Sequence, residues 1–465
     1  MMQKNNTLRN FFNYFIGDLF VKGFLFISLP LLSNILSPTE YGKLSLVNSA
    51  IMILYVFISF NLQNAVTNQY MKQKNDFDIY LGSLIIFLLP AQAVFLSLYP
   101  LYSSILSKLL QISENDLFWV IIICIQLSYI YIYTSYLQAS QQSSRFVRIN
   151  IISKVSEIIL IFLFAMALTN NKYLSKIISQ LIINVILLIY LAPLIKKIIR
   201  FKLNLIYLKY ALFFSVPLII HVTSNTLLSQ ADRLIINKFL GEYSAGIYSF
   251  SYNIGMAIIV IIMAWNASWQ PKLYNLLNEG NLIKIKSSIK NATIIIFIAS
   301  SSFIFISYEF IYLLSSRDYL SSTKIVPIVI IGNALIHIYL SYVNFVFYHR
   351  KSILISFATL TALLFNILLN YVLIPMMGIE GAAWATVVAY IILSLLHYLN
   401  SRIIMKECII PLSFLVYYFV GLILSYAIYT YTLQIDYTIG LFIRLSMIIL
   451  MLFYLYKKKP FLELN

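Results

Sequence analysis

The chain has 465 residues, of which 61% are hydrophobic and only 11% are charged, and its formal net charge at pH 7 is +17. Soluble domains carry roughly 25% charged residues, so this composition excludes a soluble enzyme or a soluble binding module. The positive charge does not indicate a nucleic-acid partner, because no basic arm or basic face gathers the Lys and Arg residues.

Apolar stretches recur from residue 11 almost to the C-terminus, and each is long enough to cross the hydrocarbon core as a helix, which takes about 20 residues. They predict an all-α integral membrane protein with about fourteen transmembrane helices. The expected spans are 11–36, 44–66, 81–103, 117–139, 149–168, 176–195, 211–236, 246–268, 291–315, 325–347, 353–374, 380–400, 411–433 and 438–456. Residues 1–10 resemble the start of a signal peptide, but the first apolar stretch is too long and lacks a cleavage site, so we expect an uncleaved first span.

The positions of the basic residues predict the orientation of the chain. Lys and Arg concentrate in alternate loops, which the positive-inside rule places in the cytoplasm. The main groups are Lys196, Lys197, Arg200, Lys202 and Lys209, then Lys272, Lys284, Lys286 and Lys290, and finally Lys457, Lys458 and Lys459. This arrangement predicts that both termini are cytoplasmic and that the protein is multi-pass.

An internal repeat with a period of 204 residues relates the two halves of the chain. Gly42 recurs as Gly246, and the basic position Arg145 recurs as His349. Because six expected helices lie in each half, the repeats should have the same orientation in the membrane. We therefore predict an N-terminal six-helix lobe at 1–210, a C-terminal six-helix lobe at 211–400, and two additional helices with a basic tail at 401–465.

Charged residues within the expected spans are the candidate functional residues, because each costs at least ~2.5–3.5 kcal/mol at the centre of a bilayer. They fall on three spans as Asp18 with Lys22, Lys154 with Glu157, and Asp232 with Arg233. One interpretation is a cavity in which Lys22, Lys154 and Arg233 bind an anionic head group such as a diphosphate. Asp18, Glu157 and Asp232 would then pair with these cations in the empty site, or bind a coupling H⁺ or Na⁺. The alternative interpretation is that all six form local ion pairs between helices.

Two further charges lie within expected spans. Arg444 is expected to reach the interface or to pair inside the protein. Glu309 lies close to the expected outer surface and is expected to be solvated.

Enzyme signatures are missing from the sequence. It contains neither the phosphate-binding loop of nucleotide hydrolases nor the H-E-x-x-H motif of zinc hydrolases. We therefore expect a protein that is not an enzyme, that uses no cofactor or metal, and that is driven by an ion gradient, the membrane potential or the gradient of its own substrate.

Two stretches resemble a known family. LLSQADRLIINKFLGEYSAGIYSFSYNIG runs from Leu227 to Gly255, and NILLNYVLIPMMGIEGAAWAT runs from Asn366 to Thr386. Both are similar to motifs of the polysaccharide-biosynthesis flippases (the Wzx or O-antigen transporter type), and Asp232 and Arg233 match the D-R pair of the first motif. The quoted motifs cover only a small part of the chain, whereas the similarity in the number of spans extends over all of it.

The resemblance implies a MATE-like fold, shared with multidrug and toxin extruders and with the lipid II flippase, in which two six-helix lobes surround a central cavity. It also implies that the substrate is an undecaprenyl-diphosphate-linked oligosaccharide. This lipid would move from the cytoplasmic to the outer leaflet of a bacterial inner membrane by alternating access, for the synthesis of O-antigen, capsule or exopolysaccharide. Polymerases and glycosyltransferases of the same pathway would be its protein partners.

Three other functions remain open from the sequence. A cation-coupled exporter of small molecules would share the fold and differ in the chemistry of its cavity. A membrane-bound polysaccharide polymerase or acyltransferase is disfavoured by the short outer loops and the scattered histidines. The third is a scaffold for glycosyltransferases that transports nothing.

Overall fold

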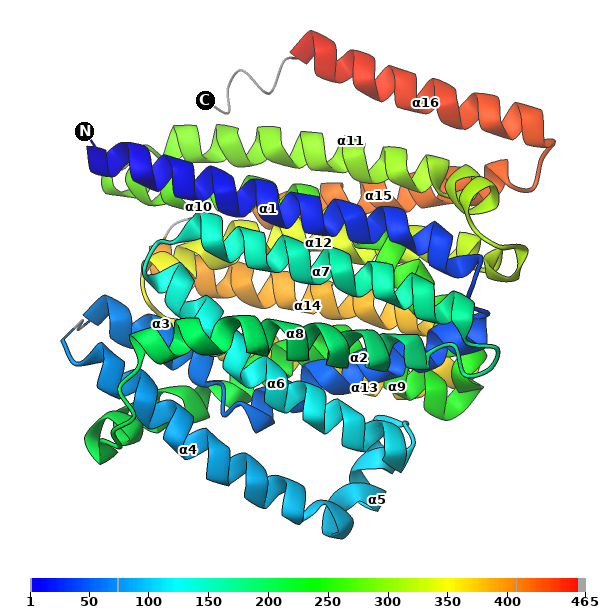
Figure 1. Ribbon diagram of the computed structural model, residues 1–465. Coiled ribbons are helices and arrows are strands. Elements are labelled where there is room, and N and C mark those ends of the chain that lie inside the picture. The colour runs from blue at the N-terminus through cyan, green and yellow to red at the C-terminus, as the bar shows by residue number, and fades with distance from the viewer. Residues whose placement is uncertain (1, 73–74, 407, 459–465) are drawn as a thin grey trace. The chain divides into compact units, whose positions relative to one another are not determined.

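The structure is a computed structural model that describes residues 2–72, 75–406 and 408–458. The regular structure of these residues is helical (Figure 1). The helices are α1 (Met2–Ser33), α2 (Pro38–Ile58), α3 (Leu62–Lys72), α4 (Phe77–Ser97), α5 (Tyr99–Leu110), α6 (Glu114–Ala139), α7 (Ser143–Ala167), α8 (Leu174–Ile198), α9 (Leu205–Gly255), α10 (Ala257–Asn278), α11 (Leu282–Leu314), the 3-10 helix η1 (Arg317–Tyr319), α12 (Ser322–Tyr348), α13 (Ser352–Met377), α14 (Ile379–Met405), α15 (Leu412–Thr432) and α16 (Tyr437–Lys458).

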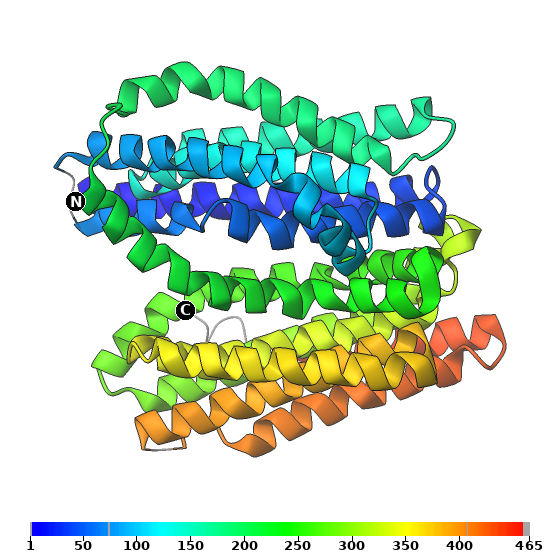
Figure 2. The same ribbon diagram turned by 90° about the horizontal axis from the view of Figure 1, so that it is seen from below.

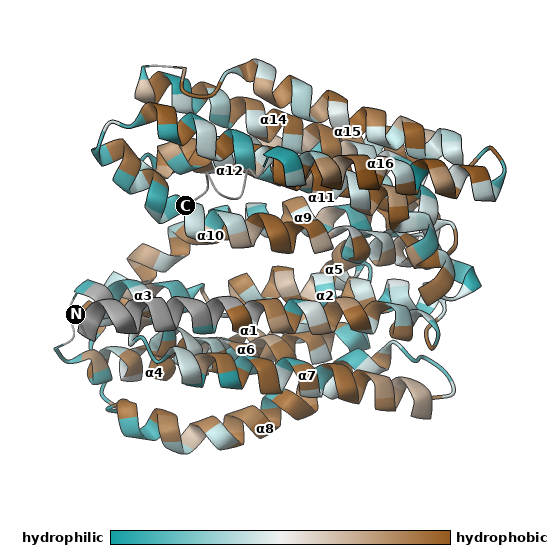
Figure 3. Cartoon of the chain, turned by 90° about the horizontal axis from the view of Figure 1, so that it is seen from above, coloured by the Kyte–Doolittle hydropathy of each residue, from teal (hydrophilic) through white to brown (hydrophobic). Residues whose placement is uncertain are grey.

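Twelve segments of the described residues are long and apolar enough to cross a membrane, and apolar residues predominate along them (Figure 3). One segment, Leu205–Asn278, has 74 residues, far more than the ~20 that one crossing needs. Its backbone leaves the helical conformation at Gly241, where φ is 78° and ψ is 176°, so we count it as two crossings. The helix Leu19–Ser33 in α1 adds one more. The predicted all-α membrane fold with about fourteen spans is therefore confirmed.

Two of the expected spans that differ from the observed helices extend across a break between helices. The expected span 44–66 is wrong at its C-terminal end, because α2 ends at Ile58 and the next residues, Phe60 and Asn61, have positive φ values of 50° and 54°. The expected span 81–103 instead covers most of α4, from residue 81 onward, and the first residues of α5. Pro100 in the first turn of α5 explains this break, because proline has no backbone N–H to continue the preceding helix.

The chain divides into two compact units. The N-terminal unit comprises Met1–Ser28 and Asn34–Gly246, and the C-terminal unit comprises Leu29–Ser33 and Ile247–Asn465. In the N-terminal unit α6 packs against α2, α3 and α8, and α7 packs along α8. This division groups most of α9 with the N-terminal unit, whereas the lobe boundaries at 210 and 400 follow the sequence repeat and stay a prediction.

Helix α12 forms the centre of the C-terminal unit. It packs against α10, α11, α14 and α15. In the most apolar stretch of this helix, 94% of the residues are buried. Helices α12, α13 and α14, coloured yellow to orange, lie together in this unit (Figure 2). A helix that is apolar on all sides and also buried on all sides has little contact with lipid, so α12 is the core helix of the unit.

A buried ion pair joins α16 to α11. Arg444 Nη2 lies 2.5 Å from Glu309 Oε1, and the exposed fractions of the two side chains are 1% and 17%. The guanidinium also lies 5.9 Å from the ring centroids of Tyr308 and Tyr429. The prediction that Glu309 is solvated is therefore wrong, because the carboxylate neutralises a cation that the neighbouring helices bury.

Candidate functional site

One buried carboxylate on α7 is shared by two lysines. Lys154 Nζ lies 2.9 Å from Glu157 Oε2, one turn along the same helix, and Lys176 Nζ on α8 contacts Glu157 Oε1. The exposed fraction of the side chain is 43% for Lys154, 10% for Lys176 and 7% for Glu157. Two ammonium groups therefore face one carboxylate, and the three residues, which we call the α7–α8 lysine cluster, carry an excess of one positive charge.

The local sequence explains how this cluster forms. Lys154 and Glu157 are three residues apart, which places them on the same face of a helix. Helices α7 and α8 are consecutive and are joined by a connection of six residues, 168–173, so they pack as neighbours. This packing brings Lys176, in the first turn of α8, against the carboxylate.

Lys176 is not among the candidate residues expected from the sequence, because it stands at the edge of the expected span 176–195. A signal was nevertheless present, since Lys176, Gln180 and Asn184 recur every four residues and therefore share one helix face. All three are at least nine-tenths buried. A polar face in a membrane segment indicates a function for that face, because polar groups in hydrocarbon are costly.

Some buried amide atoms on α8 and α6 have no partner within the protein. No protein group of the described chain hydrogen-bonds to Gln180 Oε1, Asn184 Nδ2 or, on α6, Gln126 Oε1. Buried polar atoms nearly always have a hydrogen-bond partner, which is water where the protein supplies none. Water or the polar groups of a ligand would satisfy these buried atoms on α6 and α8.

Lys22, on α1, is half-buried, and the side chain of Asp18 lies outside the described residues. Helix α1 meets α7 at two successive turns. Asn13 Nδ2 donates to Ser143 Oγ over 3.0 Å, and a Cβ added at Gly17 would lie 2.5 Å from Val147 Cγ1. The two helices therefore run parallel. Counting forward from this contact at 1.5 Å per residue places Lys22 within about 3 Å of the level of Lys154 along the helix axis.

Asp232 and Arg233 are buried on α9, with exposed fractions of 0% and 4%. The Arg233 guanidinium donates to the backbone carbonyl of Ser229, one turn earlier, over 2.5 Å. The same stretch of α9 packs against α2, where Ser49 Oγ donates to Gln230 Oε1 over 2.9 Å. In this structure the D-R pair is part of the packed interior of the N-terminal unit.

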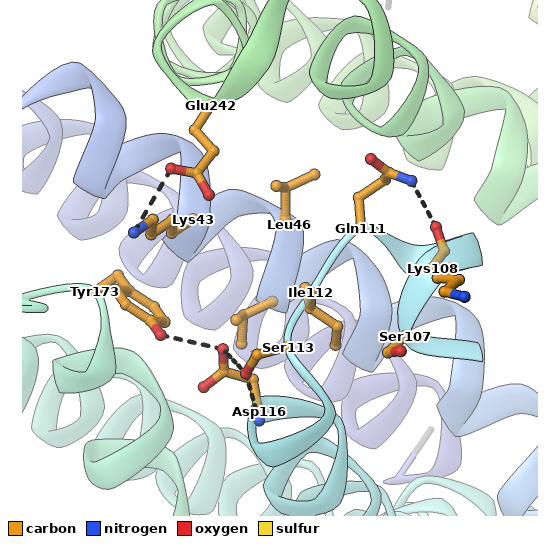
Figure 4. A pocket seen from close by; sticks show the side chains of 11 residues that line it. Lys43, Leu46, Ser107, Lys108, Gln111, Ile112, Ser113, Asp116, Tyr173 and Glu242 are labelled. Carbon is orange, nitrogen blue, oxygen red and sulfur yellow. Dashed lines mark hydrogen bonds and ion pairs between the residues drawn. The ribbon is translucent and has the colours of Figure 1, made fainter. Parts of the chain in front are cut away.

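A second polar region of this unit is a pocket of about 420 Å³ that includes Lys43, Asp116, Tyr173 and Glu242 (Figure 4). Asp116 Oδ2 accepts hydrogen bonds from the hydroxyls of Ser113, at 2.7 Å, and Tyr173, at 3.1 Å. Burial, together with the negative charge of Asp116, raises the pKa of the Tyr173 hydroxyl. Lys43 pairs with Glu242 across 3.5 Å and lies over the Tyr173 ring. Acidic and basic groups balance in this pocket, in contrast to the α7–α8 lysine cluster.

The pairing of Lys43 with Glu242 depends on a close approach of α2 to α9. A Cβ added at Gly42 would lie 2.0 Å from Glu242 O, and one added at Gly246 would lie 1.8 Å from Pro38 O. Both distances are shorter than any real contact, and the obstructing atoms belong to the backbone. Only glycine fits at these two positions.

Comparison with known proteins identifies the family of this chain. Residues 7–276, more than half of the chain, match the family described as polysaccharide biosynthesis protein. The chain belongs to the polysaccharide biosynthesis protein family. The match includes the stretch from Leu227 to Gly255 that carries the D-R pair, so the family resemblance inferred from the sequence is confirmed.

Two proteins of Haemophilus influenzae are similar to this family member over most of its length. A protein of the Lsg locus is 23% identical over 429 residues, which cover 84% of this chain and 97% of the relative. An uncharacterized membrane protein is 24% identical over 393 residues, which cover 81% of this chain and 94% of the relative.

Solved structures show the same fold at low sequence identity. The lipid II flippase MurJ, in an inward closed conformation, aligns with a TM-score of 0.66 and 15% identity, covering 95% of this chain and 98% of that one. A mutant form of the Vibrio cholerae MATE transporter VcmN aligns with a TM-score of 0.58 and 15% identity over 87% of this chain and 98% of that one. This polysaccharide biosynthesis protein is therefore a multi-pass membrane protein with a MATE-like fold, as predicted.

Proposed function

We propose that this protein is a flippase that moves an undecaprenyl-diphosphate-linked oligosaccharide from the cytoplasmic to the outer leaflet of a bacterial inner membrane. Membership of the polysaccharide biosynthesis protein family supports a saccharide substrate. The observation that carries the proposal is the excess positive charge of the α7–α8 lysine cluster, within helices that are apolar enough to span the membrane. An excess positive charge in this environment attracts an ion of opposite sign.

Lys154 would be the first residue of this cluster to contact the diphosphate. Its side chain is 43% exposed, whereas Lys176 and Glu157 are nearly buried. When Lys154 turns toward an incoming anion, Glu157 keeps Lys176 as its counterion, so no carboxylate is left unpaired. A charge-assisted hydrogen bond of this kind contributes roughly 1.5–3 kcal/mol.

The same carboxylate would assist release of the substrate. Glu157 competes with the diphosphate for Lys154, and it takes Lys154 back when the site empties. The empty site is then more stable than three isolated charges would be, and the bound lipid is held less tightly than by a free ammonium group. A transporter needs this balance, because a substrate bound too tightly cannot leave on the other side of the membrane.

Other predicted residues have secondary parts in the proposal. Lys22 would add a second cation from α1 at nearly the same level as Lys154. Arg233 would reach the substrate only after a rearrangement of α9, because it is 4% exposed. Asp18, Glu157 and Asp232 would balance these cations, and a proton or Na⁺ on Asp18 or Asp232, outside the α7–α8 lysine cluster, would couple transport to an ion gradient.

The protein would act as a transporter by alternating access and not as an enzyme, with both termini in the cytoplasm and with glycosyltransferases and a polymerase as pathway partners. A cluster with a net positive charge repels cations, which disfavours an exporter of cationic small molecules. The proposed product would be O-antigen, capsule or exopolysaccharide.

The decisive experiment is a deletion in cells whose repeat-unit synthesis can be followed. We expect lipid-linked repeat units to accumulate on the cytoplasmic leaflet while the glycosyltransferase activities in membrane extracts stay normal. Loss of repeat-unit synthesis itself would identify an enzyme and contradict the proposal. A normal distribution of the lipid between the leaflets would contradict it as well.

A further inference from the structure

A lipid-sized groove lies in the C-terminal unit between α11 and α15. Its volume is about 510 Å³, and its walls are mainly apolar, with Ile294 and Phe297 on α11 and Phe414 and Tyr417 on α15. Both helices are candidate membrane spans. An apolar groove of this size on a membrane-spanning protein is suited to a hydrocarbon chain.

A glycine on α15 allows Phe297, which lines the groove, to pack closely against that helix. A Cβ added at Gly421 would lie 2.7 Å from Phe297 Cε2, so the Phe297 ring packs directly onto the backbone of α15. The Phe297 and Tyr418 rings are 6.3 Å apart in an edge-to-face arrangement. These contacts hold α11 against α15 next to the groove.

Two cations mark one end of the groove. Lys286 and Lys290 line it, are four residues apart on α11, and are exposed. Lys290 immediately precedes the expected span 291–315, and Pro411, on the facing wall, begins the expected span 411–433. This end therefore lies at the level where the apolar parts of both helices begin, which is the level of lipid phosphates.

We propose that the groove binds an anionic glycerophospholipid of the surrounding bilayer, which remains bound to the protein and is not transported. Lys286 and Lys290 would hold its phosphate, and an acyl chain would lie against Ile294, Phe297 and Phe414. The charge of the lysines favours an anionic over a zwitterionic head group, and bilayer lipids are abundant enough to occupy such a site by mass action. The bound lipid would join α11 to α15.

The test uses the full-length protein in detergent, with bound lipids counted by native mass spectrometry during titration with dioleoyl-phosphatidylglycerol or dioleoyl-phosphatidylcholine. We expect the wild type to bind phosphatidylglycerol in preference. Lys286→Gln with Lys290→Gln should weaken that binding about 10-fold or more, because at least one charge-assisted contact is lost. The matched control is Lys272→Gln with Lys284→Gln, which removes the same charge near the same end of the unit but does not line the groove. Equal effects of the two pairs would overturn the proposal.

Three further binding experiments test which molecule occupies the groove. Ile294→Trp, which fills the apolar part and keeps both lysines, should weaken binding of phosphatidylglycerol; unchanged binding would overturn the proposed position of the acyl chain. Glycerol phosphate should not displace the lipid, and displacement would reduce the site to one for a simple anion. Undecaprenyl phosphate should compete no better than phosphatidylglycerol, since stronger competition would assign the groove to the transported lipid. Each variant is compared with the wild type for its elution volume and its thermal unfolding, to show that it folds.

Discussion

Gly42 and Gly246, which the sequence repeat relates across 204 residues, lie against each other where α2 meets α9. A Cβ added at Gly42 would come within 3.1 Å of Gly246 N, and one added at Gly246 within 2.9 Å of Gly42 N. In the sequence, these two glycines indicate only the period of the repeat. Their contact shows that they also fix the distance between the two helices and thereby the ion pair Lys43–Glu242.

The first prediction concerns this contact. Gly42→Ala should destabilise the protein by roughly 1–3 kcal/mol, because the new methyl group would overlap the Glu242 carbonyl and force α2 and α9 apart. Thermal unfolding of the purified protein in detergent measures the effect. Gly23→Ala is the matched control, since nothing lies within 4 Å of a Cβ at that helical glycine. Equal melting temperatures for the two variants would contradict the close approach.

The second prediction tests Lys154 as the contact for the diphosphate. Lys154→Gln should weaken binding of the lipid-linked substrate about 10- to 100-fold, since one charge-assisted hydrogen bond of roughly 1.5–3 kcal/mol is lost. Binding is measured in detergent at equal protein levels. Arg148→Gln makes the same charge change at an exposed position of the same helix and should bind normally. If both variants bind normally, the cluster does not hold the substrate.

The third prediction separates the charge of the cluster from its packing. Lys176→Met removes the second cation, so Glu157 should retain Lys154 and substrate affinity should fall even though Lys176 is nearly buried. Combining Lys176→Met with Glu157→Gln frees Lys154 again and should restore binding. If the residues only hold α7 to α8, the double variant should bind no better than Lys176→Met, a comparison that the same binding measurement makes.

The fourth prediction concerns orientation in the membrane. In a variant with the exposed Cys408 replaced by Ser, we expect a cysteine at the exposed position Lys202 to react with a membrane-impermeant maleimide only after the cells are opened. A cysteine at the exposed position Arg317 should react in intact cells. Labelling of both positions from outside would show that the positive-inside argument assigns the wrong side.

The all-α membrane fold and the number of spans could be predicted, because the lengths of the apolar stretches can be read along the whole chain. The ends of the helices were harder to predict, because they depend on single residues. Helix α2 ends at Ile58, just before the positive φ values of Phe60 and Asn61, although composition extends the expected span to residue 66. Hydropathy contains no information about such backbone angles.

The candidate site could be predicted only in part. Spacing on one helix was enough to join Lys154 to Glu157. Lys176 and the pairing of Arg444 with Glu309 involve different helices, and a single sequence does not specify which faces of two helices meet. The packing of α7 on α8 is what changes a neutral pair into a cluster with excess charge.

Gly241 has a consequence for how the chain enters the membrane during its synthesis. At 1.5 Å per residue, Leu205–Asn278 as one uninterrupted helix would be about 110 Å long, which no bilayer accommodates. Its φ of 78° with an extended ψ is a conformation essentially limited to glycine. Within α9 only this residue departs from helical geometry, so it separates the two crossings. A nascent chain therefore has one position within α9 at which the helix can be interrupted, and a residue without a side chain occupies it.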